Sequence, residues 1–151
     1  DINYTASGSE GDGNVTYGEA FTVQPFGNSL VTMTLTGQQI KDVLEQQFNN
    51  PGPGQNRILQ VSEGFSYTWD ADAPVGSKVS DMTLNGVPID LNASYRVTVN
   101  SFLADGGDNF TALRQGTDRL GGALDLDALV DYFAAYSPVA PGPVDRITVV
   151  P

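Results

Sequence analysis

The chain has 151 residues and a formal net charge of −11 at pH 7, with seven Lys and Arg in total and no Cys or His. This length suits one domain with a buried core, so we expect a single domain over residues 1–151. So few basic residues argue against binding to nucleic acid backbones. Without His or Cys, no Ser-His or Cys-His nucleophile pair can form, and a metal site would rest on Asp, Glu and Asn alone.

The first third of the sequence predicts a loop, a short helix and a strand. Residues 1–15 are rich in Gly, Ser and Asp, and they are polar and acidic, which predicts no signal peptide. Thr16 is a suitable N-cap for a helix over residues 17–23, which Pro25 interrupts. Residues 30–36, with the sequence LVTMTLT, alternate between apolar and polar side chains and predict a strand with one buried face.

The rest of the chain mixes strands with two longer helices. Thr36 and Gln39 have capping-box spacing and open a helix that we expect to run to about Asn49. The later predicted elements are a strand at 58–70, a hairpin at 78–91, a strand at 94–103, a helix at 124–136 and a strand at 146–150. This order predicts an α+β fold with mostly antiparallel strands. No stretch of 18 apolar residues occurs, so we expect no membrane segment.

Two stretches place a phenylalanine beside residues that are typical of turns. In NSFLADGGDNF, we expect the strand to stop on Phe102, with a Gly-Gly turn and Asp108 after it. The alternative is a packed Phe and a capping Asp. In QPFGN, Phe26 lies in a loop outside any periodic apolar stripe, as ligand platforms often do. It could equally fold back onto the sheet.

Two further features have a functional and a structural interpretation. The acidic stretches SEGDGN at 9–14 and DAD at 70–72 could hold calcium loosely, although neither has EF-hand spacing, and solvated loop charge is the better interpretation. The alternating aromatic residues Phe65, Tyr67 and Trp69 could stack on a carbohydrate. At strand spacing they are better interpreted as part of the core.

Taken in order, TYGEAFTVQPFGNSLVTMTLTGQQIKDVLEQQF, ILQVSEGFSYTWD and YRVTVNSFLADGGDNF resemble one family, the C-terminal domain of 5′-nucleotidases and UDP-sugar hydrolases. The resemblance runs from about Tyr17 to the end of the chain. It implies a four-layer α/β/β/α arrangement. It also implies a separate N-terminal metallophosphatase domain with two divalent metal ions, which would carry out hydrolysis of nucleotides to nucleoside and phosphate. No catalytic or metal-binding residue is therefore expected in this chain.

The resemblance also implies which residues bind the substrate. Phe26 and Phe102 would sandwich a nucleobase, and Asn28 would contact it. Asp108 would bind the ribose hydroxyls, with Gly106 and Gly107 bending the chain toward the sugar. The expected partners are a nucleoside or nucleotide and the N-terminal domain, in an extracytoplasmic protein that is secreted, periplasmic or attached to the cell wall.

One departure from the family concerns arginine. Family members carry a Gly-Gly-x-Arg stretch that the resemblance places just before Asp1, whereas the first arginine here is Arg57. We therefore expect an excised C-terminal domain with weakened binding and no phosphate side to its site. The alternative function is a secreted carbohydrate-binding or adhesion module that uses the aromatic strand face.

Overall fold

The computed structural model describes residues 13–150, in which short helices alternate with strands. The helices are α1 (Tyr17–Val23), α2 (Gly37–Gln46), α3 (Ser101–Ala104) and α4 (Asp125–Tyr136), with single turns of 3₁₀ helix at η1 (Gln47–Asn49), η2 (Gly107–Asn109) and η3 (Thr111–Gln115). The strands are β1 (Ser29–Thr36), β2 (Phe65–Asp70), β3 (Val79–Leu84), β4 (Val87–Pro88), β5 (Ser94–Asn100), β6 (Thr117–Leu124) and β7 (Ile147–Val150).

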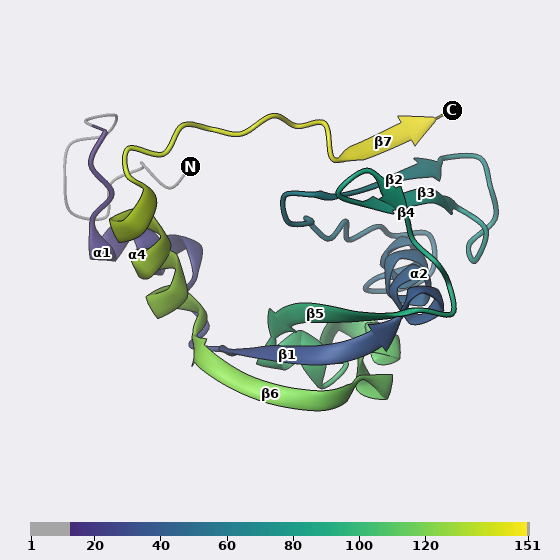
Figure 1. Ribbon diagram of the computed structural model, residues 1–151, viewed down its shortest axis with the longest axis horizontal. Coiled ribbons are helices and arrows are strands. Elements are labelled where there is room, and N and C mark those ends of the chain that lie inside the picture. The colour runs from purple at the N-terminus through teal and green to yellow at the C-terminus, as the bar shows by residue number, and fades with distance from the viewer. Residues whose placement is uncertain (1–12, 151) are drawn as a thin grey trace.

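The strands form two sheets, as Figure 1 shows. One has the order β5-β1-β6 and the other β4-β3-β2-β7. All pairings are antiparallel except that of β2 with β7. This arrangement confirms the predicted α+β class with mostly antiparallel strands.

Helix α2 joins the cores of the two sheets. Thr36 caps it with the predicted capping box, accepting a hydrogen bond from the Gln39 backbone while the Gln39 side chain accepts one from Thr36 N. Val43 is buried against β1, whereas Leu44 is buried against β2 and β3. Ile40 packs against both clusters. The apolar side chains of this helix are thus divided between two cores.

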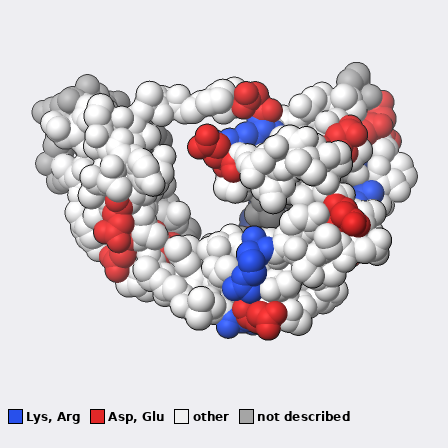
Figure 2. Space-filling model, viewed as in Figure 1, with Lys and Arg blue, Asp and Glu red and all other residues white. Residues whose placement is uncertain are grey.

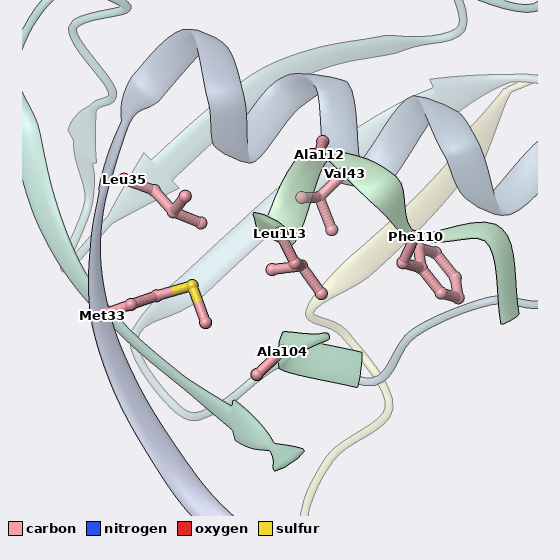
Figure 3. Close-up of a cluster of buried hydrophobic side chains, with 7 residues drawn as sticks. All are labelled: Met33, Leu35, Val43, Ala104, Phe110, Ala112 and Leu113. Carbon is pink, nitrogen blue, oxygen red and sulfur yellow. The ribbon is translucent and has the colours of Figure 1, made fainter. Parts of the chain in front are cut away.

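The first core cluster is built from four parts of the chain. Figure 3 shows its side chains directed toward one another from β1, α2, α3 and the segment around η3. Its buried members are Met33, Leu35, Val43, Ala104, Phe110, Ala112 and Leu113. Met33 and Leu35 belong to the predicted inward face of β1, so the alternation in the sequence determined which face is buried.

Helices α1 and α4 pack together at one side of the molecule, and residues 137–146 run from α4 across to β7 (Figure 1). Thr16 caps α1, as its sequence predicts, and the structure adds a reciprocal capping box with Glu19. The apolar face of α4 is only partly covered, because Leu126 is buried while Leu129, Val130 and Phe133 are half-buried.

Two predicted strands differ from the structure at their edges, and a third strand of the structure was not predicted. The strand expected at 58–70 forms only from Phe65, after Gly64 with a φ of +86°. The strand expected to run through Phe102 ends at Asn100, because the Asn100 side chain accepts a hydrogen bond from Leu103 N and starts helix α3 there. Strand β6 was not predicted, since all eight of its residues are exposed and show no alternation of burial.

Charge is spread unevenly over the surface. In Figure 2, acidic side chains occupy both sides of the face shown, and the basic ones lie in small separate groups. Within residues 13–150, none of the helices combines the length and apolar character that a membrane span needs.

The second core cluster gives the chain a fluorescent reporter of its stability. Phe48 is 2% exposed and its ring centroid lies 4.8 Å from that of Trp69, the only tryptophan. We expect Phe48→Ala to lower the free energy of unfolding by about 3–5 kcal/mol, through lost burial and the cavity left behind. Urea titration followed by Trp69 fluorescence measures this. Val87→Ala, at a 65% exposed position, is the control, and an equal loss in both variants would contradict the assignment of Phe48 to the core.

A buried phenol predicts a loss of stability at alkaline pH. Burial raises the pKa of Tyr67 above its ordinary value of 10.0, and a hydrogen bond with Gln47 partly opposes that rise. The folded chain therefore keeps a proton that the unfolded chain releases, so stability is retained below pH 10 and falls as the pH rises further. Urea unfolding followed by circular dichroism at about pH 9 and about pH 11 should show a smaller alkaline loss in Tyr67→Phe. An identical loss in both proteins would rule out Tyr67 as its source.

Candidate functional site

The predicted site residues come together because β1 pairs with β5. In this antiparallel pair, Leu30 lies opposite Asn100. The PFGN loop immediately precedes β1, and Ser101 and Phe102 immediately follow β5. Both segments therefore lie at the same end of one strand pair, although about 70 residues separate them in sequence.

A hydrogen-bonded serine joins the two segments. Ser101 Oγ donates to Asn28 Oδ1 over 3.3 Å and accepts a hydrogen bond from Ser29 N over 3.2 Å. The Asn28 carbonyl oxygen accepts from Asp125 N over 2.8 Å, at the start of α4. Asn28 is thus held on both sides, and its side-chain NH₂ has no partner among the described residues. Sequence reasoning missed Ser101, which no local motif distinguishes.

Both phenylalanines present their rings to solvent. Phe26 is 78% exposed and Phe102 is 50% exposed. Phe26 therefore does not fold back onto the sheet, which was the alternative interpretation. Ring contacts among residues 13–150 do not include a Phe26–Phe102 pair, so the two rings are not stacked on each other. Exposed aromatics of this kind can each offer a face to a flat ligand.

The Gly-Gly pair after α3 has two separate roles. Gly106 has a φ of +79°, which glycine adopts without the strain that a side chain would cause. Gly107 lies directly against Phe102: a Cβ there would be 2.6 Å from ring atoms Cε1 and Cζ and from the Phe102 carbonyl oxygen. Gly106 thus makes the turn, and Gly107 allows it to approach Phe102.

Asp108 points its carboxylate at an arginine from a different loop. Its own φ is +49°, in the left-handed region. Arg57 Nη1 forms an ion pair with Asp108 Oδ2, and Asn50 Nδ2 donates a hydrogen bond to the Asp108 carbonyl oxygen. The alternative role of Asp108 as a helix cap is wrong, since its carboxylate makes no capping hydrogen bond. Neither Asn50 nor Arg57 was predicted as a site residue, because only the folded loop brings them to Asp108.

The remaining candidate features are structural. Tyr67 is 2% exposed, and Phe65 and Trp69 pack against the same core cluster, so the aromatic face of β2 is not available for carbohydrate stacking. Asp70 Oδ1 accepts hydrogen bonds from Asp72 N and Ala73 N and so closes its own turn. Most of the acidic stretch 9–14 lies outside the described residues.

A cavity of about 450 Å³ lies between the two sheets, but it is separate from the candidate site. Its lining is mainly apolar and comes from β1, α2, β5 and residues 59–62, together with Phe65 of β2 and Leu84 of β3 in the second sheet. The predicted site residues do not line it. The candidate site is therefore an exposed surface at the end of β1 and β5.

The described residues do not fit a two-metal centre. Within residues 13–150, no three His, Cys, Asp or Glu side chains gather closely enough to hold a metal ion. Two-metal hydrolases need several such ligands around each ion.

The contact between Gly107 and Phe102 yields a direct test of the site's geometry. A Cβ at 2.6 Å cannot be accommodated, so Gly107→Ala should displace Phe102 and lower the free energy of unfolding by about 1–3 kcal/mol. NMR should show large shifts of the Phe102 ring and amide signals. Gly121→Ala is the control, because nothing lies within 4 Å of a Cβ there. Unchanged Phe102 signals in Gly107→Ala would contradict this contact.

Comparison with known proteins identifies similar folds and sequences. The 5′-nucleotidase precursor of Thermus thermophilus is 40% identical, with a TM-score of 0.81, over 90% of this chain and 28% of that protein. A 5′-nucleotidase-related protein of Glossina morsitans morsitans is 32% identical over 91% of this chain and 26% of its own length. The snake venom 5′-nucleotidase of Macrovipera lebetinus is 29% identical over 91% of this chain and 36% of its own length. The chain thus spans well under half the length of each of these relatives.

A family model gives the assignment directly. The model described as "5′-nucleotidase, C-terminal domain" matches residues 1–115. This range contains β1, α2, β5 and all six predicted site residues. The chain belongs to the family of 5′-nucleotidase C-terminal domains.

Proposed function

We propose that this chain is the nucleoside-binding domain of a 5′-nucleotidase-type hydrolase that cleaves nucleotides to nucleoside and phosphate. The observation that carries the proposal is the pair of exposed rings, Phe26 and Phe102, at one end of the β1–β5 pair. Membership of the family adds support, because the relatives named above are nucleotidases or nucleotidase-related proteins.

The chemistry of the exposed groups suits a nucleoside. A nucleobase is flat and stacks on aromatic side chains, a contact that contributes about 1–3 kcal/mol per base. The free side-chain NH₂ of Asn28 can donate to an acceptor on the base edge. A carboxylate accepts hydrogen bonds from sugar hydroxyls, which assigns Asp108 to the ribose. Each of these groups binds or orients the ligand, and none of them breaks the phosphate ester.

Hydrolysis belongs to a different domain in this proposal. This chain has no His or Cys and matches a domain described as C-terminal. The parent protein would carry an N-terminal metallophosphatase domain whose two divalent metal ions supply the attacking hydroxide and stabilise the displaced oxygen. This chain would hold the nucleoside so that its phosphate meets that centre.

The proposal also places the protein outside the cytoplasm. One relative is a venom enzyme and another is described as a precursor. Extracellular nucleotides are small-molecule substrates, and the charge of −11 disfavours a polynucleotide. We therefore assign the chain to a secreted, periplasmic or cell-wall protein.

Calorimetric titration with adenosine and with uridine tests the base sandwich. We expect saturable binding to both nucleosides, because stacking on an aromatic ring depends on the flat face that every base has more than on the identity of the base. Phe26→Ala and Phe102→Ala should each weaken binding about 5- to 150-fold, which corresponds to the loss of one stacking contact. The titrations should extend to millimolar nucleoside.

A matched control separates loss of the site from general loss of an exposed aromatic. Tyr136 is 66% exposed at the end of α4 and lies in neither loop, so Tyr136→Ala should bind as the wild type does. Wild-type affinity in both phenylalanine variants would place the base elsewhere. No binding of either nucleoside at millimolar concentration would refute nucleoside binding by this chain.

A further inference from the structure

The Gly-Gly-Asp turn is held from outside by the loop that follows α2 and η1. Three contacts join the two segments. Asn50 Nδ2 donates to the Asp108 carbonyl oxygen, Arg57 Nη1 pairs with Asp108 Oδ2, and Asn109 Nδ2 donates to the Pro51 carbonyl oxygen over 2.9 Å. Because Asp108 and Asn109 both have positive φ, the turn has an unfavourable local conformation that these external contacts help to maintain.

The loop is itself anchored to the core, so it can act as a fixed support. Asn50 and Gln47 are each 0% exposed. Arg57 N donates to the Gln47 carbonyl oxygen over 2.8 Å, and Leu59 N donates to Gln47 Oε1 over 3.0 Å. The backbone of Arg57 is therefore fixed beside a buried side chain, while its guanidinium extends outward to the turn.

The ion pair remains open to solvent and uses only part of the carboxylate. The Arg57 side chain is 47% exposed and that of Asp108 is 33% exposed. Arg57 occupies Oδ2, and Oδ1 has no partner among the described residues. An arginine beside one carboxylate oxygen restricts rotation of the carboxylate and leaves the second oxygen free to accept a hydroxyl hydrogen bond.

We propose that Arg57 is a positioning residue that orients the Asp108 carboxylate toward the sugar and thereby sets a preference for ribose over sugars that lack the 2′ and 3′ hydroxyls. This inference rests on the proposed nucleoside-binding function. It adds a residue that acts through Asp108 and needs no contact with the base.

The test compares two ligands that differ only in those hydroxyls, adenosine and 2′,3′-dideoxyadenosine. Calorimetry measures both affinities for the wild type, Arg57→Gln, Arg57→Lys, Asp108→Asn and the double variant Arg57→Gln/Asp108→Asn. Arg96→Gln is the matched control, because Arg96 is another exposed arginine that contacts Thr34 and Asp118 on β1 and β6. It changes the net charge by the same amount as Arg57→Gln.

We expect the wild type to bind adenosine more tightly than the dideoxynucleoside. Arg57→Gln should weaken adenosine binding about three- to tenfold and leave dideoxyadenosine binding unchanged, whereas Arg57→Lys should restore part of the loss. In the Asp108→Asn background, Arg57→Gln should have no further effect, because its partner carboxylate is gone. Arg96→Gln should match the wild type for both ligands.

The outcomes that overturn the inference differ from those that overturn the proposed function. Equal weakening of both ligands in Arg57→Gln would show that Arg57 only supports the fold. Unchanged ribose preference in Arg57→Gln, with the wild type still binding adenosine, would also reject a positioning role. No adenosine binding by the wild type would refute the proposed function and this inference together.

Discussion

The antiparallel pairing of β1 with β5 is the constraint on which the candidate site depends. It places Leu30 opposite Asn100, so the loop before one strand and the turn after the other share an edge. Closing a segment of about 70 residues has an entropic cost that grows only slowly with length. Burial of Met33 and Leu35 beneath the same strand pair favours that closure. The core of β1 thus supports the loops at its end.

Helix α2 extends this support from the core to the second half of the site. One of its faces packs under β1 and the adjacent one under β2 and β3. Its last turn continues into η1, where Gln47 is buried and holds the backbone of the loop that reaches Asp108. A disturbance of α2 packing would therefore reach the carboxylate as well as the two cores.

The two halves of the site meet at a close backbone approach. Gly107 lies against Phe102, and Ser101, the residue before that ring, hydrogen-bonds Asn28 in the other loop. These contacts connect the aromatic part of the site with the carboxylate part through short, stiff links. Exposed binding groups need such support, because side chains that are free to rotate lose more entropy when a ligand binds. In our proposal, this surface binds and orients a nucleoside for chemistry in another domain.

The sequence by itself determined the features that depend on neighbouring residues. The N-cap at Thr16, the capping box at Thr36 and the alternation through β1 produced elements where they were expected. The family motifs marked the site residues, whose binding roles stay predictions. Only the tertiary structure decided that an exposed β6 joins β1 and that Arg57 meets Asp108. These outcomes depend on partners distant in sequence, whose pairing is set by packing of the whole chain rather than by local propensity.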